Sequence, residues 1–97
     1  MILFKKGNIM KLTVYSDPGH AWVKIKKSKL LELNIHDRIS GYSYQRKDYA
    51  YLEEDADVSV LITKLKEHNI DDSFNEVVSA RRSRIRNYCT YKPEEKE

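Results

Sequence analysis

Alternating apolar and polar positions predict a β-hairpin early in the chain. From Lys11 to Ser16, Leu12 and Val14 fall on one face of a strand, and residues 21–26 alternate in the same way, as half-buried strands do. Residues 17–20, DPGH, fit a type II turn, since proline fixes φ at its second position and glycine accepts a positive φ at its third.

Two later segments have helical features. Ser28 is predicted to cap a short helix that ends at Leu33, with the Asn34-Ile35 pair as a Schellman-type stop. Asp55 or Asp57 is predicted to cap the main helix, which ends in a second Asn-Ile pair. Its apolar residues recur at helical spacing, which predicts one buried stripe, formed by Val58, Leu61, Ile62 and Leu65.

The remaining pattern predicts more strands. Residues 38–46 and 49–53 read as two strands joined at Lys47-Asp48, residues 71–75 as a polar loop, and residues 76–80 as a last strand. The order ββαββαβ predicts a single small α+β domain with a mostly antiparallel sheet and one main amphipathic helix.

We expect this domain to span residues 11–88, after a lead-in at 1–10 and before a solvated tail at 89–97. Residues 81–92 could be strand, helix or disordered, and an extended conformation would put Arg82, Arg84, Arg86 and Tyr88 on one face.

Composition changes this picture in two ways. The chain has 97 residues, and a domain this small buries a thin core, so we expect a homo-oligomer. No apolar run approaches a membrane span, and the start does not read as a signal peptide. The single Cys89 excludes an internal disulfide. We therefore expect a cytoplasmic protein with no membrane association.

Charge is distributed unevenly along the sequence. Residues 1–47 have ten Lys/Arg against three Asp/Glu, residues 48–76 have two against nine, and residues 77–92 have five against none. The basic segments either neutralise the acidic one within the fold or converge on an anionic partner.

Residues 11–53 resemble the AbrB-type swapped-hairpin regulators in their order of strand, Gly-containing turn, strand, short helix and hairpin. The segment GHAWVKIKKSKLLELNIHDRIS followed by YAYLEE carries this resemblance. It implies an intertwined dimer that binds DNA through basic residues near the first hairpin, here Lys24, Lys26 and Lys27.

A second resemblance covers most of the chain. The motifs DPGHAW (17–22), YSYQR (42–46) and YLEED (51–55) are similar to those of short accessory proteins of bacteriophages and plasmids. This resemblance implies a mobile-element context, in which small proteins often counter host defences.

The candidate site combines aromatic and basic side chains. On the strand at 21–26, Trp22 points away from the face expected to be buried. It either packs under the second helix or against a partner subunit, or it joins an aromatic wall for a nucleotide base. Arginine suits phosphate because its planar donors match phosphate geometry. The predicted ligand-binding residues are His20, Trp22, Tyr42, Tyr44, Arg46, Arg82, Arg84 and Arg86.

Other chemistry has little support in the sequence. The run Glu53-Glu54-Asp55 reads as a strand end and helix cap rather than a metal site, because consecutive strand residues point to opposite faces. Ser43 and Ser59 have no visible catalytic partner, and no glycine-rich phosphate loop is present. We expect no enzyme activity, no metal and no cofactor.

These observations lead to three hypotheses. The first is a non-enzymatic accessory protein that binds an anionic, nucleotide-type ligand and acts in counter-defence, either by sequestering a nucleotide signal or by occluding a host defence complex. The alternatives are an AbrB-like dimeric DNA-binding regulator and a protein inhibitor whose acidic segment 48–57 mimics nucleic acid.

Overall fold

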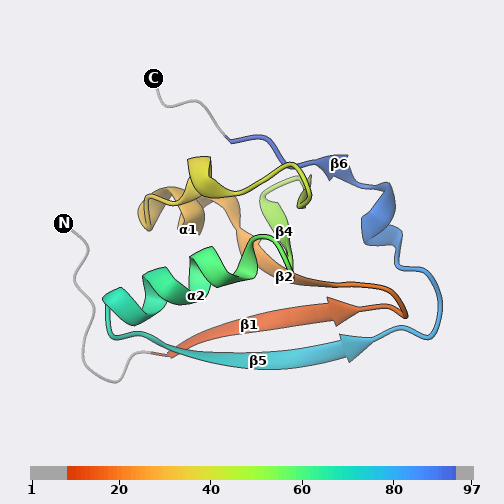
Figure 1. Cartoon of the computed structure of the whole chain (residues 1–97), viewed down its shortest axis with the longest axis horizontal. Coiled ribbons are helices and arrows are strands. Elements are labelled where there is room, and N and C mark those ends of the chain that lie inside the picture. The colour runs from red at the N-terminus through yellow and green to blue at the C-terminus, as the bar shows by residue number, and fades with distance from the viewer. Residues whose placement is uncertain (1–8, 94–97) are drawn as a thin grey trace.

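The computed structural model describes residues 9–93. Its main element is a six-stranded mixed sheet (Figure 1). The strand order is β5-β1-β2-β4-β3-β6, with β5 parallel to β1 and every other pairing antiparallel. The predicted α+β class and mostly antiparallel sheet are therefore confirmed. The strands are β1 (Ile9–Ser16), β2 (Ala21–Lys26), β3 (Tyr44–Arg46), β4 (Tyr49–Glu53), β5 (Asp71–Val78) and β6 (Cys89–Thr90).

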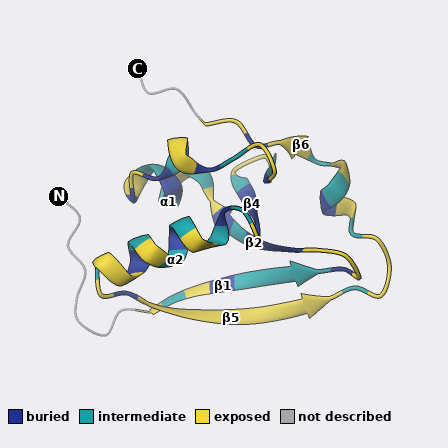
Figure 2. Ribbon diagram, in the orientation of Figure 1, coloured by how far each residue is buried: buried dark blue, intermediate teal, exposed yellow. Residues whose placement is uncertain are grey.

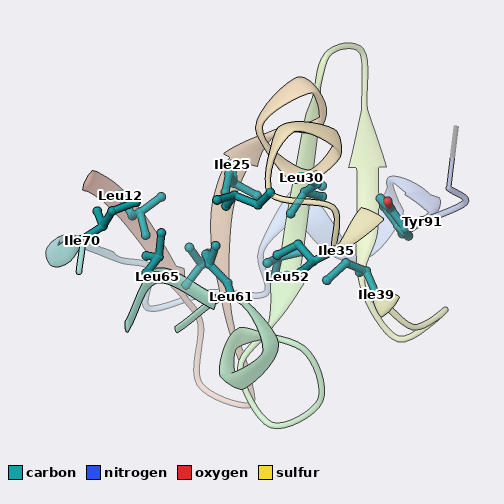
Figure 3. Close-up of a cluster of buried hydrophobic side chains, with 13 residues drawn as sticks. Leu12, Ile25, Leu30, Ile35, Ile39, Leu52, Leu61, Leu65, Ile70 and Tyr91 are labelled. Atoms are coloured by element: carbon teal, nitrogen blue, oxygen red, sulfur yellow. The ribbon is translucent and has the colours of Figure 1, made fainter. Parts of the chain in front are cut away.

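Two α-helices, α1 (Lys27–Glu32) and α2 (Val58–Glu67), cover one face of this sheet (Figure 1). Short 3-10 turns lie at η1 (His36–Arg38) and η2 (Arg84–Asn87). The main core fills the space between helices and sheet (Figure 3). Its buried side chains come from Leu12, Val23, Ile25, Leu30, Leu33, Ile35, Ile39, Ala50, Leu52, Leu61, Leu65, Ile70 and Tyr91.

Both helices end as predicted. Asn34 and Asn69 have positive φ values of 59° and 55°. The amide of the isoleucine that follows each asparagine donates a hydrogen bond back to the preceding helix. Ile35 N–H donates to the Leu30 carbonyl at 3.0 Å, the Schellman pattern. Both isoleucines are buried in the core, so each stop also anchors the next segment.

The predicted start of α1 is wrong, and that of α2 is correct in position only. The helix α1 begins before Ser28, with Lys26 at the N-cap and no side-chain capping bond. Asp57 occupies the N-cap of α2, but its carboxylate accepts hydrogen bonds from the Ser40 amide and hydroxyl at 3.0 and 2.8 Å, and from the Ser43 hydroxyl. This buried carboxylate therefore ties the loop before β3 to the start of α2.

Three predicted boundaries also shift. Only residues 44–46 of the expected strand 38–46 pair in the sheet, because η1 and a turn occupy the rest. The expected polar loop at 71–75 is the first part of β5. The expected lead-in overlaps β1 at residues 9–10, and residues 1–8 lie outside the described part.

The expected solvated tail starts too early. Residues 89–90 form β6, and Tyr91 is buried, with its hydroxyl donating to the His36 carbonyl at 2.6 Å. Among residues 9–93, neither α-helix has the length and apolar character needed to cross a membrane.

Candidate functional site

An aromatic cluster occupies the sheet face that the helices leave open. Trp22 on β2 and Tyr51 on β4 are buried there with Ile85 of η2. Alternate strand residues point to opposite faces, so their neighbours Val23 and Leu52 lie in the main core instead. Four half-buried tyrosines pack around this second cluster: Tyr15, Tyr44, Tyr49 and Tyr88.

An ion pair fastens η2 to the first hairpin. Arg86 donates two hydrogen bonds to Asp17, from Nε at 2.7 Å and Nη2 at 2.8 Å, and its guanidinium lies 5.4 Å from the Trp22 ring centre. The Ser83 amide also donates to Asp17, at 2.9 Å. Hydrogen bonding to Arg86, and then to the Ser83 amide, holds the pKa of the Asp17 carboxyl far below its usual range.

Asp17 also shapes the hairpin turn, and the predicted type II turn is wrong. Its Oδ1 accepts from the Gly19 and His20 amides at 3.0 and 2.9 Å, an Asx-type arrangement, and Gly19 does not have a positive φ. The glycine serves close approach instead, because a Cβ there would lie 2.8 Å from Arg86 Nη2.

A basic cavity of about 650 Å³ lies beside this ion pair. We call it the tyrosine groove. Four of its side chains are cationic and none is acidic. Its lining comes from strands of the open face and from the segment around η2, namely Tyr15, Lys24, Arg46, Tyr51, Ser79, Arg82, Ser83, Arg84, Ile85, Asn87 and Tyr88.

The tyrosines in the groove contact one another. The Tyr51 ring centre lies 5.1 Å from that of Tyr88 and 6.4 Å from that of Tyr15, in tilted arrangements. Burial, together with the neighbouring Tyr88 and Tyr15, raises the pKa of the Tyr51 phenol. This hydroxyl therefore stays protonated at neutral pH and can donate a hydrogen bond to an anion.

The four cations of the groove differ in their contacts with other side chains. Arg46 lies over the Tyr88 ring at 5.3 Å, and the Lys24 ammonium lies over the Tyr49 ring at 4.2 Å. Arg82 and Arg84 are exposed, and neither forms an ion pair within residues 9–93. All four cations reach one cavity because β2, β3 and the η2 segment meet on this face.

The groove brings together only part of the residue set expected from the sequence. Arg46, Arg82 and Arg84 line it. Trp22 has 2% exposure and lies beneath Arg86 on the face opposite α2, so it forms neither an open aromatic wall nor the predicted contact under the second helix. Arg86 itself is held by Asp17, so it acts as a structural residue.

Besides Trp22 and Arg86, three more of the predicted residues lie outside the groove. Tyr44 packs edge-on against Trp22 at 6.3 Å. Tyr42 precedes β3, is 76% exposed and does not share a strand face with Tyr44. His20 lies 3.3 Å from the Glu53 carboxylate.

Tyr15, Tyr51 and Tyr88 were not among the ligand-binding residues expected from the sequence, and Lys24 was expected only as a DNA contact implied by the AbrB resemblance. Strand alternation does place Tyr15 and Lys24 opposite the core positions of their strands. The missing information was the strand order. Tyr44 lies opposite Tyr51 in the sheet, and Tyr51 lies opposite Lys24.

The acidic run 53–55 has an architectural role. Glu53 Oε2 accepts from the Asp55 and Ala56 amides at 2.8 and 2.9 Å, so it closes the turn that leads into α2. The three carboxylates of Glu53, Glu54 and Asp55 lie within 4.8 Å of one another. The expectation that they must diverge was wrong, because the strand ends at Glu53 and the chain turns.

Comparison with known proteins gives no relative: no family model, no curated protein and no solved structure matches this chain significantly. Function must therefore be argued from the groove itself.

Proposed function

We propose that this protein binds an anionic, nucleotide-type ligand in the tyrosine groove and does not transform it. The observation that carries this proposal is the composition of the lining: Lys24, Arg46, Arg82 and Arg84 surround tyrosine rings, with no carboxylate among the lining residues. Like charges gathered around one cavity repel each other unless an anion joins them.

The groove chemistry fits both parts of a nucleotide. Arginine forks bind phosphate through two parallel hydrogen bonds, and tyrosine rings stack on bases of any sequence. A cavity of about 650 Å³ lies within the usual range for small-molecule sites. Because Asp17 holds Arg86 and the Ser83 amide, the η2 side of the site is positioned before a ligand arrives.

The hydroxyls of the groove favour binding over covalent catalysis. Ser79 Oγ donates to the Arg81 carbonyl at 2.8 Å, and Ser83 Oγ accepts from the Ile85 amide at 3.2 Å. Both serines thus stabilise turns. A nucleophile needs an adjacent base, and the lining residues include no histidine or carboxylate.

A second basic hollow adjoins the groove at Lys24. It has about 360 Å³, shares Lys24 with the groove, and is also lined by Lys11, Lys26, Lys29 and Tyr49. Lys24 and Lys26 lie two residues apart on β2, so they share a face about 7 Å apart. We expect ligands with separated phosphates, such as dinucleotides, to bind more tightly than mononucleotides.

The resemblance to phage and plasmid accessory proteins suggests the biological role. There, a nucleotide-binding protein without catalysis would act in counter-defence by sequestering a nucleotide signal or by occluding a defence complex. DNA regulation remains the alternative, and it predicts duplex affinity that falls steeply with salt. For the acidic-mimic hypothesis, Glu53 is already engaged in the fold, which leaves Glu54 and Asp55 exposed.

Isothermal titration against inorganic phosphate, nucleosides, mononucleotides, and linear and cyclic dinucleotides tests the proposal. We expect nucleotides to bind, dinucleotides best, and nucleosides weakly, because the cations supply most of the affinity. No heat with any phosphate-bearing compound would refute the proposal. Binding to duplex DNA alone would favour the regulator.

Tyr42 and Tyr88 offer a matched pair of tyrosine variants. Tyr88→Ala should weaken nucleotide binding by about 1–3 kcal/mol, the value of one base–aromatic stack. Tyr42→Ala should leave affinity unchanged, because Tyr42 is exposed in a turn and does not line the groove. Equal losses in the two titrations would place the site elsewhere.

A further inference from the structure

The strand β5 forms one edge of the sheet and is open along its whole length. It pairs only with β1 among residues 9–93, and all eight of its residues are exposed (Figure 2). Its exposed apolar side chains are Phe74, Val77 and Val78, with exposed fractions of 43%, 43% and 69%. An edge of this kind is a template for pairing with another chain.

The two edges of the sheet differ. At the opposite edge, β6 has only two residues, and very short edge strands discourage pairing. The edge strand β5 has eight residues, keeps a continuous register with β1, and contains neither proline nor lysine. The protective features common on exposed edges are therefore missing from β5, apart from its acidic side chains.

The backbone direction identifies which groups are available. Ser79 N–H donates to the Ser16 carbonyl at 2.8 Å, so peptide groups at odd positions of this segment point toward β1. Since successive residues alternate, the N–H and C=O groups of residues 72, 74, 76 and 78 point to the open edge.

Charge along this segment is self-complementary. The strand begins with Asp71 and Asp72, and Arg81 follows its end, all three exposed. In an antiparallel pair of identical strands, the acidic end of each copy lies beside the basic end of the other. We propose that β5 pairs antiparallel with β5 of a second copy of this chain.

Such pairing joins the two sheets into one continuous sheet. The two-fold axis of an antiparallel edge pair is perpendicular to the sheet, so the interface is isologous and both tyrosine grooves open on the same face. A small domain with a thin core also gains buried apolar surface at Phe74 and Val78. This inference does not depend on the ligand of the groove.

Light scattering after size exclusion tests the pairing, with two reciprocal charge swaps. The wild type should run at twice the monomer mass of 11.5 kDa. Asp71→Arg and Arg81→Asp should each become monomeric, because like charges then meet at both ends of the strand pair. An equimolar mixture of the two variants should recover the dimer mass, since the ends are complementary again.

Glu76→Pro tests the backbone bonds separately. It removes an outward N–H and no bond to β1. The variant should therefore be folded by circular dichroism and monomeric by light scattering, whereas Glu76→Ala should stay dimeric. Lys66→Asp on α2 changes net charge as much as the arginine swap and should leave the dimer intact. A monomeric wild type, or a dimer that persists in both swaps and in Glu76→Pro, would overturn the proposal.

Discussion

Replacing Arg82 and Arg84 together by alanine should weaken nucleotide binding by about 100-fold or more. A hydrogen bond to a charged group contributes about 1.5–3 kcal/mol, which is about tenfold or more in affinity for each arginine. Both side chains line the tyrosine groove, are exposed and form no ion pair with the described residues 9–93, so their loss should leave the fold intact. Isothermal titration with the best dinucleotide measures the effect.

Arg81 supplies the matched control for this variant. It lies beside Arg82 in the sequence and is exposed, but it does not line the groove. Arg81→Ala should therefore keep most of the affinity at physiological salt. If Arg81→Ala loses as much affinity as the double variant, binding reflects diffuse charge rather than a formed site.

Replacing Arg86 by methionine should have the largest effect on stability. The Asp17 carboxylate has no side-chain exposure and would lose its cation, and the Trp22 ring would lose the guanidinium packed over it. A buried charge left without its partner is strongly destabilising. Thermal unfolding should show a lower melting temperature, and the η2 side of the groove should lose its position.

The double variant Asp17→Asn/Arg86→Met separates charge from packing. Removing both partners costs less than removing one, so this variant should melt above Arg86→Met alone. Lys66→Ala on the exposed side of α2 should change stability by no more than about 0.5 kcal/mol. A melting temperature for Arg86→Met equal to that of Lys66→Ala would show that the ion pair contributes nothing.

The same ion pair predicts the direction of the pH dependence. The folded-state pKa of Asp17 lies below the ordinary value of 3.8, so below about pH 4 the unfolded chain takes up the proton first. The stability from this pair is full above that pH and is lost as the pH falls further. Acid unfolding of Asp17→Asn should therefore depend less on pH than that of the wild type.

Local sequence patterns predicted one strand and both helix ends. Residues 49–53 match β4 in both bounds, and the two Asn-Ile stops take the expected conformation. The first half of β5 was read as a loop because its side chains are exposed on both faces, so it lacks the alternation that burial imposes. Its strand conformation depends on parallel pairing with β1, a contact far away in the sequence.

The site was only partly predictable for a similar reason. The sequence predicted a site made of arginine and aromatic side chains, and Arg46, Arg82 and Arg84 do line the groove. The sequence could not show that Asp17 forms an ion pair with Arg86, which lies 69 positions away along the chain. Nor could it show that Ile85 covers Trp22, which removes that ring from the accessible surface.

The location of bound nucleotide tests the central claim most directly. In an amide chemical-shift titration of the wild-type protein with a dinucleotide, the shifts should concentrate at residues that line the tyrosine groove, such as Lys24, Arg84, Asn87 and Tyr88. Residues of the exposed side of α2, such as Lys66, should not move. Shifts confined to α2 or to the turn around Tyr42, or no shifts at all, would contradict the assignment of the groove as the binding site.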